Sequence, residues 1–491
     1  MPKINTTKIN TYKDIRMIPY ISNQPGSGKT HYMIDEIIKT HQNVKHVITQ
    51  PTVKLQDETE NALKVISEHV KVLNTDNKNG NLLKDIRTAL RDSTVRVLLI
   101  TEAMFYLLEP SELLQVKIWM DDCIQFSSNY FTGIAVDDYE QWSNIYSKNI
   151  FEVTKTINDD FNEVIVKEPS YEMSDDTIRI IENITFKMRS YNKLAVNKDY
   201  IKNPPVSNEQ KRFVTLVGWH DLSVYQDHNI IFMANNFESS LLYKYNHKYF
   251  YKVDFKGKED FDESRLDVRF FVPSTSLKFG LTKAYTESVE GKKLVSKAVG
   301  YINENEKMFY CTENIDCPKL NGDYYPPLLR GVNTLTHFST AVFFSCMNAT
   351  PIEMITYKKL FGFSSLDLKS ERELEVMHQF CARGVMRLRD VDTKMTIYVL
   401  SEDQALYLSE SPTYIDVNLL HKKATKPGPK PTLDEIQQNA WNAFKRSCER
   451  NKKYDGLDAF IKKMKFDELV ITYIRTQFTK FKEKQKIKHN I

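Results

Sequence analysis

Residues 23–30 read Asn23-Gln-Pro-Gly-Ser-Gly-Lys-Thr30, which matches the phosphate-binding loop pattern G-x-x-x-x-G-K-[ST] at every fixed position except the first. The apolar run 17–21 before the loop suits a buried strand, and residues 31–39 after it carry apolar side chains at helical spacing. The pattern predicts a strand, a glycine-rich turn and a helix, in that order. This context favours a nucleotide site over a surface turn that happens to precede Lys-Thr.

Each residue of the loop has an expected role in binding ATP. Gly26 and Gly28 let backbone N–H groups approach the phosphates, and the N-terminus of the helix adds partial positive charge. Lys29 reaches the β- and γ-phosphates, and the hydroxyl of Thr30 binds Mg²⁺. Asn23 departs from the pattern, but Asn adopts turn conformations more readily than most residues. We therefore expect ATP and Mg²⁺ as cofactors, with ATP bound by Gln24, Gly26, Ser27, Gly28, Lys29 and Thr30.

The composition is ordinary for a globular protein: 41% of the 491 residues are hydrophobic and 27% are charged. This length exceeds a single core, so we expect about three domains, or two domains with a large insertion. No apolar run is long enough to span a membrane, and the first residues do not form a secretion signal. The six cysteines are scattered without metal-binding spacing, which favours reduced thiols, no zinc site and a cytoplasmic protein.

Charge is distributed unevenly along the chain. Residues 421–491 hold 18 Lys and Arg against 8 Asp and Glu, a balance of +10, so the rest of the chain carries −6 of the net +4. A polyanion would meet this basic segment first. The alternative is a solvated, solubilising or partner-docking face.

Strand and helix patterns alternate over the first 126 residues. Apolar strand runs occur at 44–49, 95–100 and 116–120, separated by helical stretches, which predicts βαβ units and a parallel sheet. Ligands bind outside the carboxyl ends of such strands. Thr101 and Asp121 are expected there. Asp121 can bind Mg²⁺, and the adjacent Asp122 can orient the attacking water.

A second series of strands, at 266–272, 307–312, 340–345 and 395–400, also alternates with helical stretches. The sequence therefore predicts an α/β protein with two tandem lobes. We expect a first, ATP-binding lobe over 1–126 and 226–260, a mostly helical insertion over 127–225, a second lobe over 261–420, and a basic linker with a small helical C-terminal unit over 421–491.

The second lobe contains a candidate anion site. Arg383 and Arg387 stand one helical turn apart and are expected on one face of a helix that includes Gln379. Structural ion pairs are the alternative reading of this pattern. With a phosphate-binding loop in the other lobe, the natural target of both guanidiniums is the γ-phosphate across a cleft.

The order of these patterns resembles the superfamily 2 (DEAD/DEAH-like) helicases and translocases. The loop is similar to their A-x-x-G-S-G-K-T sequence, with Asn at the Ala position, and Asp122 stands where their D-E-x-x box has Glu. The segments that carry the resemblance are, in chain order, Asn23–Thr30, Gln50–Leu55, Leu99–Ala103, Trp119–Asp122, Met233–Asn236, Arg330–Asn333 and Gln379–Arg387. Compact proteins with such divergent motifs are common in phages and other mobile elements.

The resemblance implies two RecA-like lobes, ATP hydrolysis in the cleft between them, and a nucleic-acid partner. DNA is favoured over RNA, single-stranded DNA included, with a role in replication, recombination or repair. The residues implied for catalysis are Lys29, Asp121, Asp122, Gln379, Arg383 and Arg387, and those for nucleic-acid binding are Pro51, Thr52, Thr101, Arg330 and Asn333.

Two other functions remain open on the sequence alone. One is a packaging or assembly motor ATPase, although no clustered acidic nuclease site stands out between residues 265 and 400. The other is a nucleic-acid-binding protein with a degenerate nucleotide site, which the departures at Asn23 and Asp122 keep open.

Overall fold

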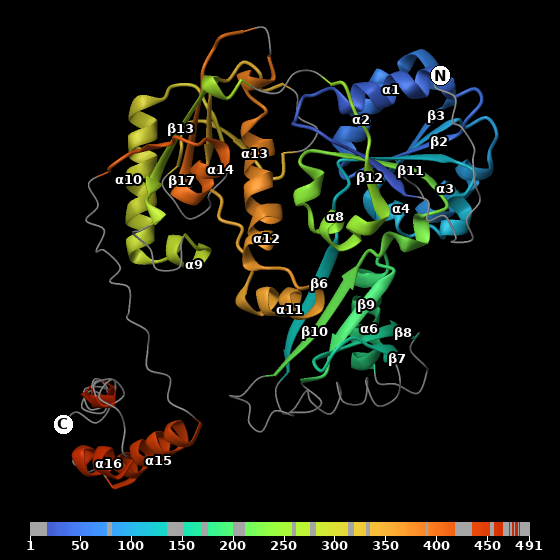
Figure 1. The fold of residues 1–491 in the computed structure, drawn as a ribbon. Helices are drawn as coiled ribbons and strands as arrows, with labels where there is room; N and C mark the ends of the chain where they lie inside the picture. The colour runs from blue at the N-terminus through green and yellow to red at the C-terminus, as the bar shows by residue number, and fades with distance from the viewer. Residues whose placement is uncertain are drawn as a thin grey trace, which may run out of the picture. The chain divides into compact units, whose positions relative to one another are not determined.

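The computed structural model of the chain describes most residues from Met17 to Phe481 (Figure 1). The described residues are 17–75, 81–134, 151–167, 175–199, 212–257, 262–274, 281–312, 319–329, 334–388, 391–417, 435–451, 456–464, 471, 474–475, 477–479 and 481. The chain divides into two units, Met1–His421 and Lys422–Ile491, which are described separately.

Seven parallel strands form the first sheet, in the order β12-β1-β11-β5-β2-β4-β3. Their bounds are β1 Ile18–Ser22, β2 His46–Gln50, β3 Val70–Leu73, β4 Val97–Thr101, β5 Lys117–Asp121, β11 Asn229–Ala234 and β12 Phe250–Lys252. Helices cover both faces, so the central strands β5 and β2 are buried almost throughout, and their polar residues stand mainly at the strand ends. Only β11 lies between β1 and β5 in the sheet. The carboxyl end of β1, where the loop 23–30 begins, is therefore close to Asp121 at the carboxyl end of β5.

The helices of this lobe lie in two layers (Figure 1). Helices α1 (Lys29–Thr40) and α2 (Val53–Ala62) pack on one face through residues such as Met33, Ile37 and Leu63. Helices α3 (Leu82–Arg91), α4 (Glu102–Phe105) and α8 (Leu241–Asn246) cover the other face.

A second parallel sheet has the order β15-β14-β16-β17-β13-β18. Its strands are β13 Leu266–Val272, β14 Tyr310–Thr312, β15 Asp323–Tyr325, β16 Thr340–Phe343, β17 Met395–Ser401 and β18 Thr413–Tyr414. Its helices are α9 Lys283–Thr286, α10 Val289–Asn305, α11 Pro351–Phe361, α12 Ser365–Lys369, a π-helical turn Ser370–Leu374, α13 Glu375–Cys381 and α14 Glu402–Leu408. Helix α10 packs on one face, and α13 and α14 pack on the other. The predicted α/β class with two tandem lobes is confirmed.

The predicted mostly helical insertion is not observed. Its described residues form an antiparallel sheet in the order β6-β10-β9-β8-β7, with one long helix against it. The elements are β6 Ser127–Ile134, β7 Phe151–Thr156, β8 Phe161–Val166, α6 Asp175–Met188, β9 Lys193–Asn197 and β10 Arg212–Trp219. A strand with one solvated face needs apolar residues at no more than alternate positions. In β7 only Phe151 is buried and the five residues after it are exposed, so its strand signal is weak.

The insertion contacts the second lobe through α11 (Figure 1). The hydroxyls of Ser127 and Tyr357 lie 2.6 Å apart, and the amide of Asn129 donates to Glu353 over 2.6 Å. Beside them the ring of Phe126 packs against Phe361, with centroids 5.0 Å apart. These contacts join the insertion, which leaves the first lobe after β5, to the second lobe.

The C-terminal unit has a core of its own, built by Trp441, Phe444, Phe460 and Phe478. Its helices α15 (Glu435–Asn451) and α16 (Leu457–Met464) agree with the predicted small helical unit. The predicted basic linker, 422–432, lies outside the described residues. Within the part of the chain that the structure describes, no helix is both long and apolar enough to cross a membrane.

Candidate functional site

The loop 23–30 connects β1 to α1 as predicted. Gly26 and Gly28 have φ of 78° and 94°, in the left-handed region that favours glycine. Gly28 is the N-cap of α1, so no N-cap side chain competes for the first backbone N–H groups of the helix. These groups therefore remain available to an anion, and the dipole of the helix favours one.

The ammonium group of Lys29 lies over the loop. Its Nζ donates to the carbonyl oxygens of Asn23 over 2.6 Å and of Gln24 over 3.0 Å. Burial lowers the pKa of Lys29, while Asp122 and Asp121 act in the opposite direction. A phosphate group in the loop would compete with the two carbonyls for this buried cation.

Thr30 and Asp121 meet at the carboxyl end of β5. The Thr30 hydroxyl donates to the carboxylate of Asp121 over 3.2 and 3.3 Å. Burial, with the neighbouring charge of Asp122, raises the pKa of Asp121 to about 6. A hydroxyl and a carboxylate are hard oxygen donors, and Mg²⁺ is commonly held by one or two such groups together with substrate phosphates. These two residues therefore fit the expected metal site.

Gln50 is a residue of this site that sequence reasoning missed. It is buried at the end of β2, and its Nε2 donates to Asp121 Oδ2 and to Thr59 Oγ1, each over 2.8 Å. Gln50 thereby holds the Asp121 carboxylate in place and ties α2 to the same point. Its position at a strand end, beside Pro51-Thr52, is the only signal in the sequence.

Asp122 has a left-handed backbone, with φ of 60°. Its N–H donates to the carbonyl of Met233 on β11 over 2.8 Å. A non-glycine residue in this region is uncommon and is often found where function requires it. The turn ends β5 abruptly, and Asp122 lines a cavity to which both lobes contribute residues.

One cavity of about 790 Å³ brings together side chains from both lobes. Its lining contains the loop from Pro25 onward and the charged groups that flank it. The residues are Pro25, Gly26, Ser27, Gly28, Lys29, Thr30, His31, Ile34, Leu55, Glu58, Thr59, Asn61, Ala62, Asp121, Asp122, Asn235, Gln379, Arg383 and Arg387. The structure thus gathers all six residues predicted for catalysis at one site.

The route by which the two arginines reach the cavity differs from the prediction. Helix α13 ends at Cys381, so Arg383 follows the helix and Arg387 belongs to a separate 3₁₀ turn, Val385–Arg387. Gly384 lies between them in extended conformation, and a Cβ there would be 2.9 Å from the carbonyl oxygen of Phe338. The segment after the helix is therefore packed closely against Phe338 and Met395, a tertiary contact that helical periodicity could not reveal.

The two guanidiniums share a desolvated environment. Arg383 is 6% exposed, and burial together with the charge of Arg383 lowers the pKa of Arg387 to about 10. Within the described residues, Nε of Arg387 is buried and has no hydrogen-bond partner. A buried and a half-buried guanidinium beside each other are suited to an anion that carries several oxygens.

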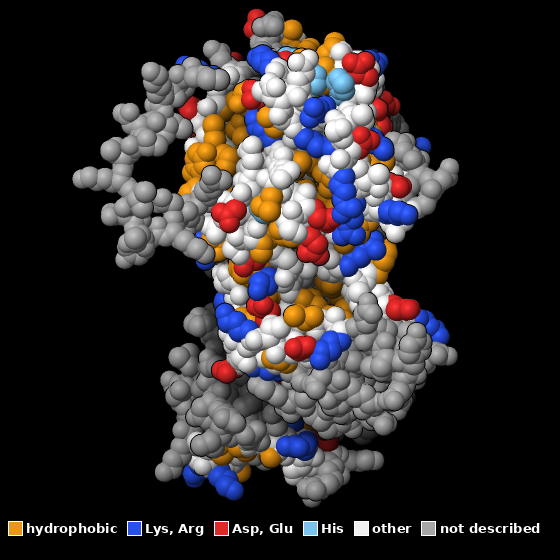
Figure 2. Space-filling view, turned by 90° about the vertical axis from the view of Figure 1, so that its right-hand side faces the viewer, with side chains coloured by type: hydrophobic (Ala, Val, Ile, Leu, Met, Phe, Trp, Pro, Cys, Tyr) orange, Lys and Arg blue, Asp and Glu red, His pale blue; other side chains and the backbone are white. Residues whose placement is uncertain are grey.

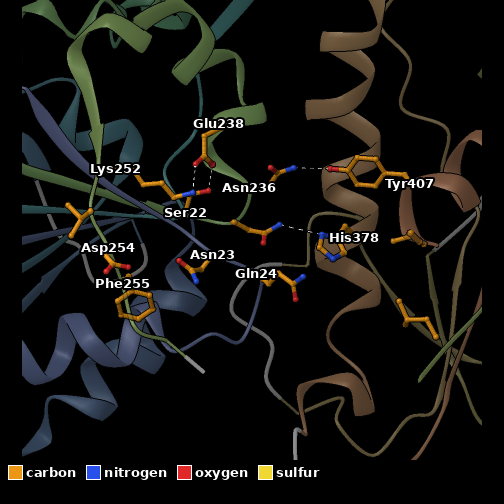
Figure 3. Close-up of a pocket in the computed structure, with 14 residues that line it drawn as sticks. Ser22, Asn23, Gln24, Asn236, Glu238, Lys252, Asp254, Phe255, His378 and Tyr407 are labelled. Atoms are coloured by element: carbon orange, nitrogen blue, oxygen red, sulfur yellow. Dashed lines mark hydrogen bonds and ion pairs between the residues drawn. The ribbon is translucent and has the colours of Figure 1, made fainter. Parts of the chain in front are cut away.

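A second cavity, of about 860 Å³, is lined by residues on either side of the boundary between the lobes (Figure 3). Asn236 donates to the hydroxyl of Tyr407 over 3.1 Å, and Asn235 donates to Glu375. Gln379 also donates to Glu375, over 3.2 Å. Asn235 lines both cavities, so the cavity that contains the loop adjoins a polar contact between the lobes.

The residues predicted for nucleic-acid binding are only partly described. Thr52 caps α2, with its hydroxyl accepting from the Leu55 N–H over 3.3 Å, and Pro51 precedes it. Thr101 ends β4 and pairs in register with the buried Gln50. The half-buried Pro51, Thr52 and Thr101 therefore share one edge of the sheet. Arg330 and Asn333 lie outside the described residues.

Surface charge on the face drawn in Figure 2 is mixed. Lys and Arg side chains form a band down that face, with Asp and Glu side chains interspersed beside them. This view therefore does not single out a purely basic surface.

Comparison with known proteins gives likenesses in fold only. No protein-family model and no curated protein matches this chain. Among solved structures, Xpd4 from S. tokodaii is 12% identical, over 81% of this chain and 96% of that chain, with a TM-score of 0.41. A variant of Dbp5 from S. cerevisiae, bound to RNA and ADP BeF3, is 9% identical over 82% and 86%, with a TM-score of 0.35. At these scores neither likeness says what this chain does.

Proposed function

We propose that the chain is an ATP-dependent nucleic-acid helicase or translocase that hydrolyses ATP between its two lobes. One observation carries the proposal: Lys29, Thr30, Asp121 and Asp122 of the first lobe line the same cavity as Gln379, Arg383 and Arg387 of the second. Phosphoryl transfer needs this combination of a phosphate cradle, metal ligands, a water-orienting acid and cations from the opposite side.

The first lobe holds the triphosphate and the water. Lys29 exchanges its loop carbonyls for the β- and γ-phosphates, and the N–H groups at the start of α1 bind the same oxygens. Thr30 and Asp121 would hold Mg²⁺, which would supply positive charge to the phosphates. Gln50 fixes the Asp121 carboxylate. Asp122 orients the attacking water and accepts its proton.

The second lobe completes the site. Arg383 and Arg387 stabilise the charge that develops on the transferred phosphoryl group, a contribution that depends on their being held in a desolvated position. Gln379 is anchored by Glu375, which also accepts from Asn235 of the first lobe. Occupation of the cavity is thereby linked to the contact between the lobes.

A change in that contact would drive a step along nucleic acid. We propose Pro51, Thr52 and Thr101 as backbone-contacting residues of the first lobe and Arg330 and Asn333 as those of the second. DNA, single-stranded forms included, is the proposed partner. Contacts of this kind to phosphates make affinity fall as salt rises.

ATP hydrolysis measured alone, with single-stranded DNA and with single-stranded RNA tests the proposal. Stimulation by either nucleic acid, lost in Lys29→Ala, is the expected result, and the stronger activator identifies the substrate class. Hydrolysis that survives Lys29→Ala would overturn the site assignment. Nucleic-acid binding without any hydrolysis would instead favour a binding protein with a degenerate site, which the Asp at position 122 keeps as the second candidate.

A further inference from the structure

Glu58 is an acidic residue of the cavity to which the proposed mechanism gives no role. It lies on α2, between two buried residues that fix the helix: Gln56 accepts from the side chain of Asn74 over 3.0 Å, and Thr59 accepts from Gln50 over 2.8 Å. Its neighbours Asp57 and Glu60 are exposed. Glu58 is therefore the one acid of α2 that the helix presents to the cavity.

The charged groups of the cavity form two sets. Three Lys or Arg and three Asp or Glu line it, together with His31. Asp122 and Asp121 are the acids that act most strongly on Lys29, and Asp121 also receives hydrogen bonds from Thr30 and Gln50. These two acids therefore belong with the phosphate-binding loop.

The third acid acts on the arginines. Burial raises the pKa of Glu58, and Arg383 and then Arg387 are the charges that most oppose this rise. In turn, Glu58 is the acid that most strongly favours the charged form of Arg387, ahead of Asp122. The interaction crosses from α2 of the first lobe to the segment after α13 of the second.

We propose that Glu58 is an internal counter-ion of Arg383 and Arg387 that competes with the terminal phosphate of a nucleoside triphosphate for these two guanidiniums. This inference rests on the proposed function. A carboxylate and a phosphoryl group present the same kind of oxygen pair to a guanidinium fork, so both can use the same donors. Once the phosphoryl group is bound, its charge also repels the Glu58 carboxylate.

The competition distinguishes triphosphates from diphosphates. ATP carries the terminal group that must take the arginines from Glu58, whereas ADP does not. Removing the charge at position 58 therefore raises the affinity for ATP more than the affinity for ADP. The quantity to measure is the ratio of the two dissociation constants, because a general loosening of the fold changes both in the same direction.

Equilibrium titration of the full chain with a fluorescent, non-hydrolysable analogue of ATP and with fluorescent ADP, in the presence of Mg²⁺, gives this ratio for the wild type, Glu58→Gln and the control Glu60→Gln. We expect Glu58→Gln to shift the ratio toward ATP by roughly fivefold or more, the size of a modest coupling between sites. Glu60→Gln, on the same helix but exposed, is expected to match the wild type. An unchanged ratio in Glu58→Gln, or a shift toward ADP, overturns the proposal.

A double-mutant cycle adds a test that does not depend on one variant. In an Arg387→Ala background the shift caused by Glu58→Gln is expected to shrink, because one of its two partners is gone. An undiminished shift overturns the pairing. Lys29→Ala distinguishes a failure of the Glu58 proposal from a failure of the proposed function. If Lys29→Ala binds ATP as tightly as the wild type, the nucleotide site is assigned wrongly and both proposals fail.

Discussion

The hydroxyl of Thr30 lies 3.2 Å from Oδ2 of Asp121, although the two residues are 91 positions apart in the chain. The contact joins the first turn of α1 to the end of β5 across the intervening strand β11. It sets two oxygen donors side by side where a nucleotide-bound Mg²⁺ would need them.

Thr30 is expected to matter through this hydroxyl. Thr30→Val keeps the shape of the side chain and removes the donor, so the affinity for MgATP should fall by about tenfold or more. Thr30→Ser keeps the hydroxyl and is expected to stay within a few fold of the wild type. Titrations with and without EDTA check the cause, since the difference between the two variants should disappear when the metal is chelated.

Arg387 should affect turnover more than binding. Its side chain lines the cavity from the second lobe, and its proposed role is to stabilise charge that develops during the reaction. Arg387→Ala is expected to lower kcat by about a thousandfold while the dissociation constant of ATP changes only severalfold. Single-turnover hydrolysis together with equilibrium binding separates the two quantities. Equal losses in both would assign Arg387 to ground-state binding.

The left-handed backbone of Asp122 predicts a contrast between two replacements. Asn tolerates this conformation, whereas Ala costs about 1 kcal/mol or more there. Both variants lose the carboxylate and should lose hydrolysis, but Asp122→Asn should melt close to the wild type and Asp122→Ala should melt lower. Retained hydrolysis in Asp122→Asn would show that another group orients the water.

Buried histidines predict a loss of stability on the acid side. Burial lowers the pKa of His46, His220 and His378 to about 4, 3 and 4, below the usual value of about 6.5. The unfolded chain therefore binds more protons as the pH falls below about 6.5, and stability is complete above that value and decreases toward the folded pKa values. Melting curves at pH about 7.5 and 5 check the trend.

His220 offers a variant for this test. Its ring stacks on Tyr106 with centroids 3.5 Å apart, and Phe can keep the stack without a titrating group. His220→Phe is expected to lose less melting temperature between the two pH values than the wild type does. A steeper pH dependence in the variant would contradict the assignment.

How far the sequence predicts the structure depends on what each residue faces. The strands beside the loop are buried on both sides, so their apolar runs could be identified, and Lys29 and Asp121 could be placed at their ends. The strands of the insertion could not be identified, because strands such as β7 keep only part of one face apolar. A strand pattern of that kind is easily taken for loop and helix.

Residues whose roles are set only by tertiary contacts also could not be predicted from the sequence. No local pattern marks Glu58, and the strand-end position of Gln50 does not reveal that its side chain bonds Asp121. Arg383 and Arg387 converge on the cavity although the helix expected to carry both ends at Cys381. The two arginines were thus identified correctly, but from a continuous helix that the structure does not contain.

The packing of α11 against the insertion limits how the chain can be shortened. Tyr357 and Phe361 belong to the second lobe, but part of the surface that covers them is made by Phe126, Ser127 and Trp219. Excising that segment to obtain a minimal two-lobed protein would expose an aromatic patch and favour aggregation. The insertion and α11 form one packing unit, so a change of length or residue on one side requires a matching change on the other.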